Sequence, residues 1–161
     1  MNADDLRTVM VRDLEALVRE VNAYPDDEGP WRAVPGIANP GGTLALHLAG
    51  NVQHFIGVVL GGSSYVRDRD AEFSRRGVPR AELAAGLRQA IAEANRVFPT
   101  LTAAQMDAIY PIEVGGKRLP TRRWLTHLTS HLAYHLGQVD YHRRMVAPAT
   151  GTVGTMALET L

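Results

Sequence analysis

Residues 121–146 read TRRWLTHLTSHLAYHLGQVDYHRRMV and carry two patterns at helical spacing. One pattern is apolar and recurs every three or four residues, at Leu125, Leu128, Leu132, Leu136 and Val139. Such a stripe predicts a long amphipathic helix that buries one face. The other pattern is a ladder of histidines four residues apart, His127, His131 and His135.

Three further segments carry an apolar stripe of the same kind, roughly residues 3–24, 43–60 and 79–98. Proline or glycine marks their ends, as at Pro25, Gly61 and Pro99. Four helices with one apolar face each must bury those faces against one another. The sequence therefore predicts an all-α fold, a bundle of four antiparallel helices, with residues 1–161 as one domain.

The connections between these helices are uneven in length and composition. Residues 63–77 are polar and have weak periodicity, which indicates a long connection. The four arginines of this segment and Arg80 just after it form a basic run, which we interpret as part of a solvated loop. They are Arg67, Arg69, Arg75, Arg76 and Arg80. Before the last helix, the turn pair Gly115-Gly116 lies between short alternating segments, and this predicts a small β-hairpin.

Composition narrows the classes of function. The chain has 17 basic and 17 acidic residues, and this balance argues against nucleic-acid binding. No apolar run approaches the roughly 18 residues of a membrane span, and the N-terminal residues do not read as a signal peptide. We therefore expect a cytoplasmic protein with no membrane partner. Because the chain has no cysteine, disulfides and thiolate metal ligands are excluded.

Helical phase distinguishes among the histidines of the last helix. At 100° per residue, His135 lies nearest the apolar stripe, His131 lies at its flank, and His127 points furthest away. His131 and His135 are therefore the pair that can share one ion. On the second helix His47 occupies the flank of its own stripe, where it could supply a third ligand, and Asn51, His54 and Gln138 are candidates for lining the same pocket.

Three imidazoles predict an open metal site. Catalytic zinc sites use three protein ligands and leave one position free, whereas structural zinc sites use four. Imidazole also suits Ni²⁺, Fe²⁺ and Cu²⁺, so the ligand type alone does not name the metal. We expect one divalent ion, Zn²⁺ or Ni²⁺. The alternative is that two histidines four residues apart form only a surface pair.

The order of these motifs resembles a known family. Leu46-His47-Leu48-Ala49, followed by His131-Leu-Ala-Tyr-His135-Leu-Gly-Gln138, is similar to the DinB/YfiT-like metalloenzymes over about residues 40–145. The stretch from Tyr65 to Phe73 also resembles one branch of that family. The resemblance implies a four-helix bundle in which a histidine on the second helix and an H-x-x-x-H pair on the last one bind a divalent metal. One departure is Leu136, where many members carry an arginine.

The resemblance also implies candidate activities. Relatives include S-transferases that use a low-molecular-weight thiol such as bacillithiol or mycothiol, and a thiol-dependent maleylpyruvate isomerase. We therefore expect a small-molecule substrate, an electrophile, and a homodimer formed through helix faces. Two alternatives stay open: a hydrolase that uses metal-bound hydroxide, and a non-catalytic stress-response bundle that binds metal.

Overall fold

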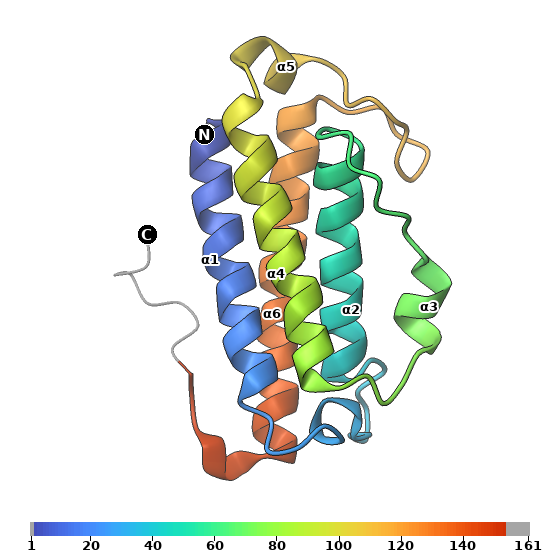
Figure 1. Ribbon diagram of the computed structural model, residues 1–161, viewed down its shortest axis with the longest axis vertical. Helices are drawn as coiled ribbons and strands as arrows, with labels where there is room; N and C mark the ends of the chain where they lie inside the picture. Colours follow the sequence, from blue (N-terminus) through green and yellow to red (C-terminus); the bar gives the residue numbers. More distant parts are fainter. Residues whose placement is uncertain (1, 154–161) are drawn as a thin grey trace.

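Four long helices lie side by side in the computed structural model, which describes residues 2–153 (Figure 1). They are α1 (Ala3–Asn22), α2 (Gly41–Val52), α4 (Arg80–Val97) and α6 (Thr121–Val146), and α2 continues into a π-helical segment, η2 (Gln53–Val58). Their bounds agree with the expected segments to within about two residues at each end. The predicted all-α class is confirmed, and the long helices pack as a bundle.

The helices do not simply alternate in direction. In Figure 1, α1 and α6 run one way, whereas α2 and α4 both run the other way. The expectation of four antiparallel helices is therefore wrong for two neighbouring pairs, α2 with α4 and α1 with α6. A parallel pair needs a connection that returns along the whole length of a helix, about 27 Å for 18 residues at 1.5 Å each. The polar segment after α2 makes this return, and it contains the short helix α3 (Arg69–Ser74) outside α2.

The predicted β-hairpin is wrong, because no strand forms within residues 2–153. Val114 and Lys117 exchange two backbone hydrogen bonds of 3.0 Å around Gly115 and Gly116, which both have positive φ. This is an isolated bridge at a tight turn, and a second isolated bridge pairs Ile109 with Pro120. The residues between the two bridges are mostly exposed and include a proline that donates no ladder hydrogen bond, so the bridges do not join into strands.

A second short helix forms in the same connection. α5 (Ala103–Asp107) begins with a capping box, in which Thr102 Oγ1 accepts from the amide of Gln105 and the Gln105 side chain accepts from the amide of Thr102. Such reciprocal capping satisfies two otherwise unpaired backbone donors. The sequence analysis predicted neither α5 nor α3, because each is too short to show an apolar period.

The apolar stripes of the long helices meet in one core. Leu14 of α1, Leu48 of α2, Leu87 of α4 and Leu132 of α6 are each almost completely buried. α1, α4 and α6 keep polar faces toward solvent, whereas eleven of the twelve residues of α2 are buried. None of the helices within residues 2–153 is long and apolar enough to cross a membrane.

Candidate metal centre

Three histidines from α2 and α6 converge at the flank of this core. Nε2 of His131 lies 3.4 Å from Nε2 of His47 and 3.1 Å from Nε2 of His135. Their possible ligand atoms all lie within 4.8 Å of one another, so the three rings could hold one ion. The structure thus brings together the three histidines that helical phase and spacing had pointed to.

Helix geometry explains why these side chains meet. His131 and His135 are one turn apart on α6, which places their rings on the same face. The neighbouring core leucines, Leu48 on α2 and Leu132 on α6, are 1% exposed and hold the two helices together beside the cluster. His127, one turn earlier, is exposed and stacks on Trp124 at 5.1 Å between ring centroids. It is not part of the three-histidine group, as its helical phase predicted.

Hydrogen bonds at the outer ring nitrogens define the tautomers of two of these histidines. Nδ1 of His47 lies 3.0 Å from Oε2 of Glu72, and Nδ1 of His135 lies 2.6 Å from Oε1 of Gln138. Both oxygens are acceptors, so each Nδ1 carries the proton and each Nε2 presents a lone pair. Three ring nitrogens lie within one small volume, and at least two of them present a lone pair that can bind a cation. The donor set therefore fits a divalent metal.

The environment of His131 and His135 favours their neutral forms. Burial, followed by the neighbouring His135 and His47, lowers the pKa of His131 to about 4. Burial also lowers the pKa of His135, although its hydrogen bond to Gln138 acts in the opposite direction. Metal binding requires unprotonated imidazole, so both shifts favour the state that binds an ion near neutral pH.

Glu72 and Arg67 are the site residues that the sequence analysis missed. Glu72, on α3, is 6% exposed and accepts from Arg67 Nε at 2.7 Å and from Arg67 Nη2 at 2.9 Å. Burial alone would raise the pKa of Glu72, but hydrogen bonds from Arg67 and His47 lower it overall. The interpretation of Arg67 as part of a solvated loop is wrong, because its side chain is 11% exposed and forms this ion pair.

Gly50 allows Glu72 to approach α2. A Cβ at Gly50 would lie 2.1 Å from Oε1 of Glu72, closer than any real contact. The glycine therefore leaves room for the carboxylate that holds His47. The one sequence signal that pointed to this region was the resemblance of the Tyr65–Phe73 stretch, which contains both Arg67 and Glu72.

Of the remaining candidate residues, only Gln138 contacts one of the three histidines in the described hydrogen bonds. Gln138 binds His135 directly, as described above. Asn51 is buried one turn after His47 on α2, and His54 lies in η2 with its ring centroid 4.9 Å from that of Phe55. Neither belongs to the group that could share one ion. His142, near the end of α6, is buried away from the group and binds Tyr24 and the carbonyl of Arg32.

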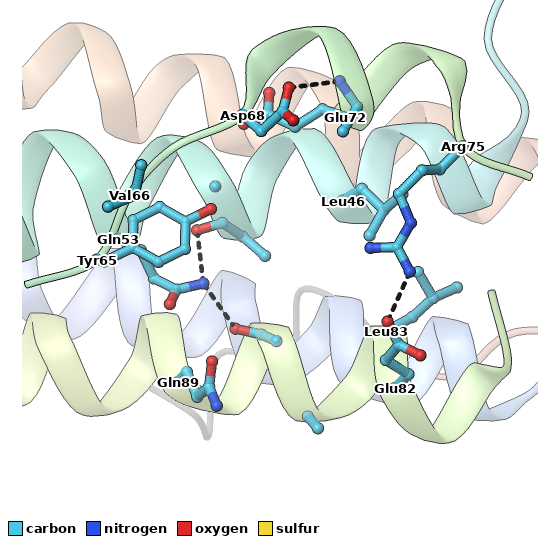
Figure 2. A pocket seen from close by; sticks show the side chains of 15 residues that line it. Leu46, Gln53, Tyr65, Val66, Asp68, Glu72, Arg75, Glu82, Leu83 and Gln89 are labelled. Carbon is cyan, nitrogen blue, oxygen red and sulfur yellow. Dashed lines mark hydrogen bonds and ion pairs between the residues drawn. The ribbon is translucent and has the colours of Figure 1, made fainter.

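A polar pocket of about 300 Å³ lies between α2, α3 and α4. Figure 2 shows Asp68 and Glu72 of the α3 region at one side, while the ion pair of Arg75 with Glu82, 2.8 Å long, closes one end. The described lining includes Glu72 but none of the three histidines. The pocket therefore touches the cluster only through the side chain that holds His47.

The helical bundle and its three-histidine cluster define a protein of the DinB-like class. Residues 5–148 match the sequence model of one family in this class, described as mycothiol S-transferase. The match covers most of the chain, so the chain belongs to the mycothiol S-transferase family. The DinB/YfiT-like resemblance seen in the motifs is thereby confirmed. No curated protein matches the sequence.

Proposed function

We propose that this protein is a metal-dependent transferase that joins a low-molecular-weight thiol, mycothiol or a close relative of it, to a small electrophile. The observation that carries the proposal is the convergence of three imidazole nitrogens, two of them with lone pairs fixed by Glu72 and Gln138. Family membership suggests the reaction class, and the cluster offers a site where a metal ion could bind the thiol.

His47, His131 and His135 would hold one divalent ion, Zn²⁺ or Ni²⁺, and three protein ligands leave a position open for a cosubstrate. When bound, such an ion lowers the pKa of a coordinated thiol and so raises the fraction of reactive thiolate. The chain itself has no cysteine, so the nucleophilic sulfur must come from the cosubstrate.

The chain's own residues orient the proposed metal ligands. Glu72 holds the His47 ring through Nδ1, and Gln138 holds the His135 ring in the same way. In a transfer, the sulfur forms a bond to the electrophilic carbon while the leaving group departs with its bonding electron pair, and the thiol's proton goes to solvent. The same thiol chemistry would serve an isomerase in which the sulfur adds to the substrate and is later eliminated.

Two other functions receive less support. A hydrolase would need a general base beside the cluster, and the described ring contact of His54, the candidate with a suitable side chain, is with Phe55 and not with any of the three histidines. A non-catalytic metal-binding bundle would be expected to add a fourth protein ligand, whereas the described group has three.

The proposal is tested on the purified protein by metal analysis and by product formation from mycothiol and an electrophile such as 4-nitrobenzyl chloride. We expect about one ion per chain and a rate above the uncatalysed thiol reaction. Chelation should abolish that excess rate, and added Zn²⁺ or Ni²⁺ should restore it. A rate unaffected by chelation would contradict the metal-dependent mechanism, and turnover without any thiol would indicate a hydrolase.

A further inference from the structure

A second, larger cavity of about 600 Å³ lies between the loop before α2, residues 36–39, and the C-terminal half of α6, from Tyr134 to Met145. We call it the apolar cavity. Its volume lies in the range of sites that bind small molecules. It is twice as large as the polar pocket of Figure 2, which measures about 300 Å³.

The lining of the apolar cavity has a distinct chemistry. Among the described residues that line it, none is an aspartate, glutamate, lysine or arginine. Several of the protein's exposed large apolar side chains gather there, Ile37, Tyr134, Tyr141 and Met145, which are 44%, 66%, 61% and 54% exposed. Contiguous exposed apolar surface of this kind marks a binding site more often than chance.

The one titratable imidazole in this lining is neutral. Nε2 of His142 lies 2.9 Å from the carbonyl oxygen of Arg32, so it donates, and Nδ1 then accepts from the Tyr24 hydroxyl at 2.7 Å. Burial lowers the pKa of His142, in agreement with this pairing. The apolar cavity therefore offers a ligand apolar surface and a few uncharged polar groups, such as the amides of Asn39 and Gln138.

One end of the apolar cavity adjoins the metal centre through two side chains that contact His135, although none of the three clustered histidines is in its described lining. Gln138, which lines the cavity, is the residue whose Oε1 holds Nδ1 of His135 at 2.6 Å. Tyr134, also in the lining, places its ring centroid 5.2 Å from that of His135. A molecule in the cavity thus contacts two side chains that touch the third histidine.

We propose that the apolar cavity binds the electrophile of the transfer reaction and selects an uncharged, largely apolar molecule, such as an aryl or alkyl halide. The proposal rests on the proposed function and names the substrate class of that same site. A formal charge on the electrophile would lose its hydration against this lining without gaining an ionic partner. For a benzylic chloride, the C–S bond forms as the C–Cl bond breaks, chloride leaves with the electron pair, and the thiol's proton goes to solvent.

Gly137 offers a way to fill the apolar cavity without touching the histidines. It lines the cavity, its φ is not positive, and a Cβ added to it would meet no atom within 4 Å. Gly137→Trp should therefore occupy the cavity while α6 keeps its helical backbone. Gly137→Ala is the matched control, because it makes the same backbone change and leaves the cavity open.

The first test measures binding directly, with the uncharged fluorophore N-phenyl-1-naphthylamine as the probe. We expect saturable binding to the wild type and to Gly137→Ala, and at least about tenfold weaker binding to Gly137→Trp, because the indole removes the space. This readout needs neither metal nor turnover, so it holds even if the transferase proposal fails. Equal binding to all three proteins would overturn the proposed site.

The second test uses two electrophiles of matched shape, 4-nitrobenzyl chloride and the anion 4-(chloromethyl)benzoate, each corrected for its uncatalysed reaction with the thiol. We expect kcat/KM to favour the uncharged compound by about tenfold or more, and Gly137→Trp to lose most of that rate. Equal rates for the two compounds would overturn the selectivity. Turnover with neither compound, alongside normal probe binding, would count against the proposed function alone.

A second copy of this chain is the competing occupant, because Tyr134 and Tyr141 are exposed aromatic side chains of α6 and the expected homodimer forms through helix faces. Light scattering on the wild type and on Gly137→Trp distinguishes the two. A dimer that Gly137→Trp breaks, together with no saturable probe binding, would assign this face to an interface between copies and overturn the inference. An unchanged mass with lost probe binding supports it.

Discussion

His131 is the central residue of the cluster, because its Nε2 lies within 3.4 Å of the Nε2 atoms of both other histidines. His131→Ala should therefore abolish tight metal binding, since two imidazoles on different helices remain. His127→Ala is the matched control, one turn away on the same helix, and should keep about one ion per chain. The measurement is metal content after dialysis without chelator. Loss of metal from His127→Ala with retention by His131→Ala would mean that the ligand set is wrong.

Protonation of His131 should make the metal-free protein sensitive to acid. The pKa of His131 is about 4 in the folded protein and about 6.5 in an unfolded chain. Between these values the unfolded state binds more protons, so the free energy of unfolding falls as pH drops from about 6.5 to about 4. His131→Asn should remove this contribution, so the variant gains stability relative to the wild type as pH falls.

The check is urea unfolding in the presence of chelator at about pH 7 and about pH 5, with the wild type and His131→Asn compared at each. Burial raises the pKa values of the carboxyls Asp13 and Glu20, so their contribution to the free energy of unfolding changes with pH in the opposite direction. Both proteins contain these carboxyls, so the comparison cancels that contribution. A difference between the two proteins that stays constant with pH would contradict the prediction.

The contact between α2 and α3 positions His47, the proposed metal ligand on α2. Glu72 reaches His47 only because Gly50 leaves space on the surface of α2. Gly50→Ala should push the carboxylate away and lower metal affinity about tenfold or more, the usual effect of losing a residue that orients a ligand. The measurement is competition with a chelating dye.

Gly86→Ala on α4 is the control for the helix-propensity effect. Its new Cβ would meet Ala49 at 3.7 Å, an ordinary contact. It should leave metal affinity unchanged and stabilise the protein by up to about 1 kcal/mol, because alanine favours a helix interior. Wild-type affinity in Gly50→Ala would show that Glu72 does not orient His47.

The whole bundle is joined at one end by a buried ion pair between its first and last long helices. Arg143 of α6 donates from Nε to Oε2 of Glu20 on α1, and both side chains are 0% exposed. Arg143→Met leaves the carboxylate of Glu20 buried without its partner and should cost about 3–5 kcal/mol of unfolding free energy. Glu20→Leu should cost less, because Arg143 keeps its ion pair with Asp140 at 3.2 Å. The double variant Glu20→Leu with Arg143→Met should lie close to the wild type, because apolar replacements of similar volume need no partner.

Urea unfolding of the singles and the double variant measures this coupling. Additive losses, with the double variant the least stable, would show that the pair does not join the helices. Because the pair lies away from the histidine cluster, metal content should stay about one ion per chain in every variant that folds.

The sequence by itself determined the helices and the metal-ligand candidates, because both depend on local periodicity. An apolar stripe at helical spacing predicted the four long helices to within about two residues at each end, and the same 100° count separated His131 and His135 from His127. The same reading predicted a β-hairpin that does not form, since two short segments around a glycine turn have too little buried surface to hold strands together. The parallel course of α2 and α4 was not visible either, because direction depends on how a connection crosses the bundle.

Only the tertiary structure decided which residues support the cluster and what lies beside it. Arg67 and Glu72 come from a connection whose polar composition is typical of a solvated loop, and they are buried because α3 folds against α2 across Gly50. The apolar cavity is assembled from a loop and a helix about one hundred residues apart. No local period relates such segments, because their proximity follows from the packing of the whole bundle.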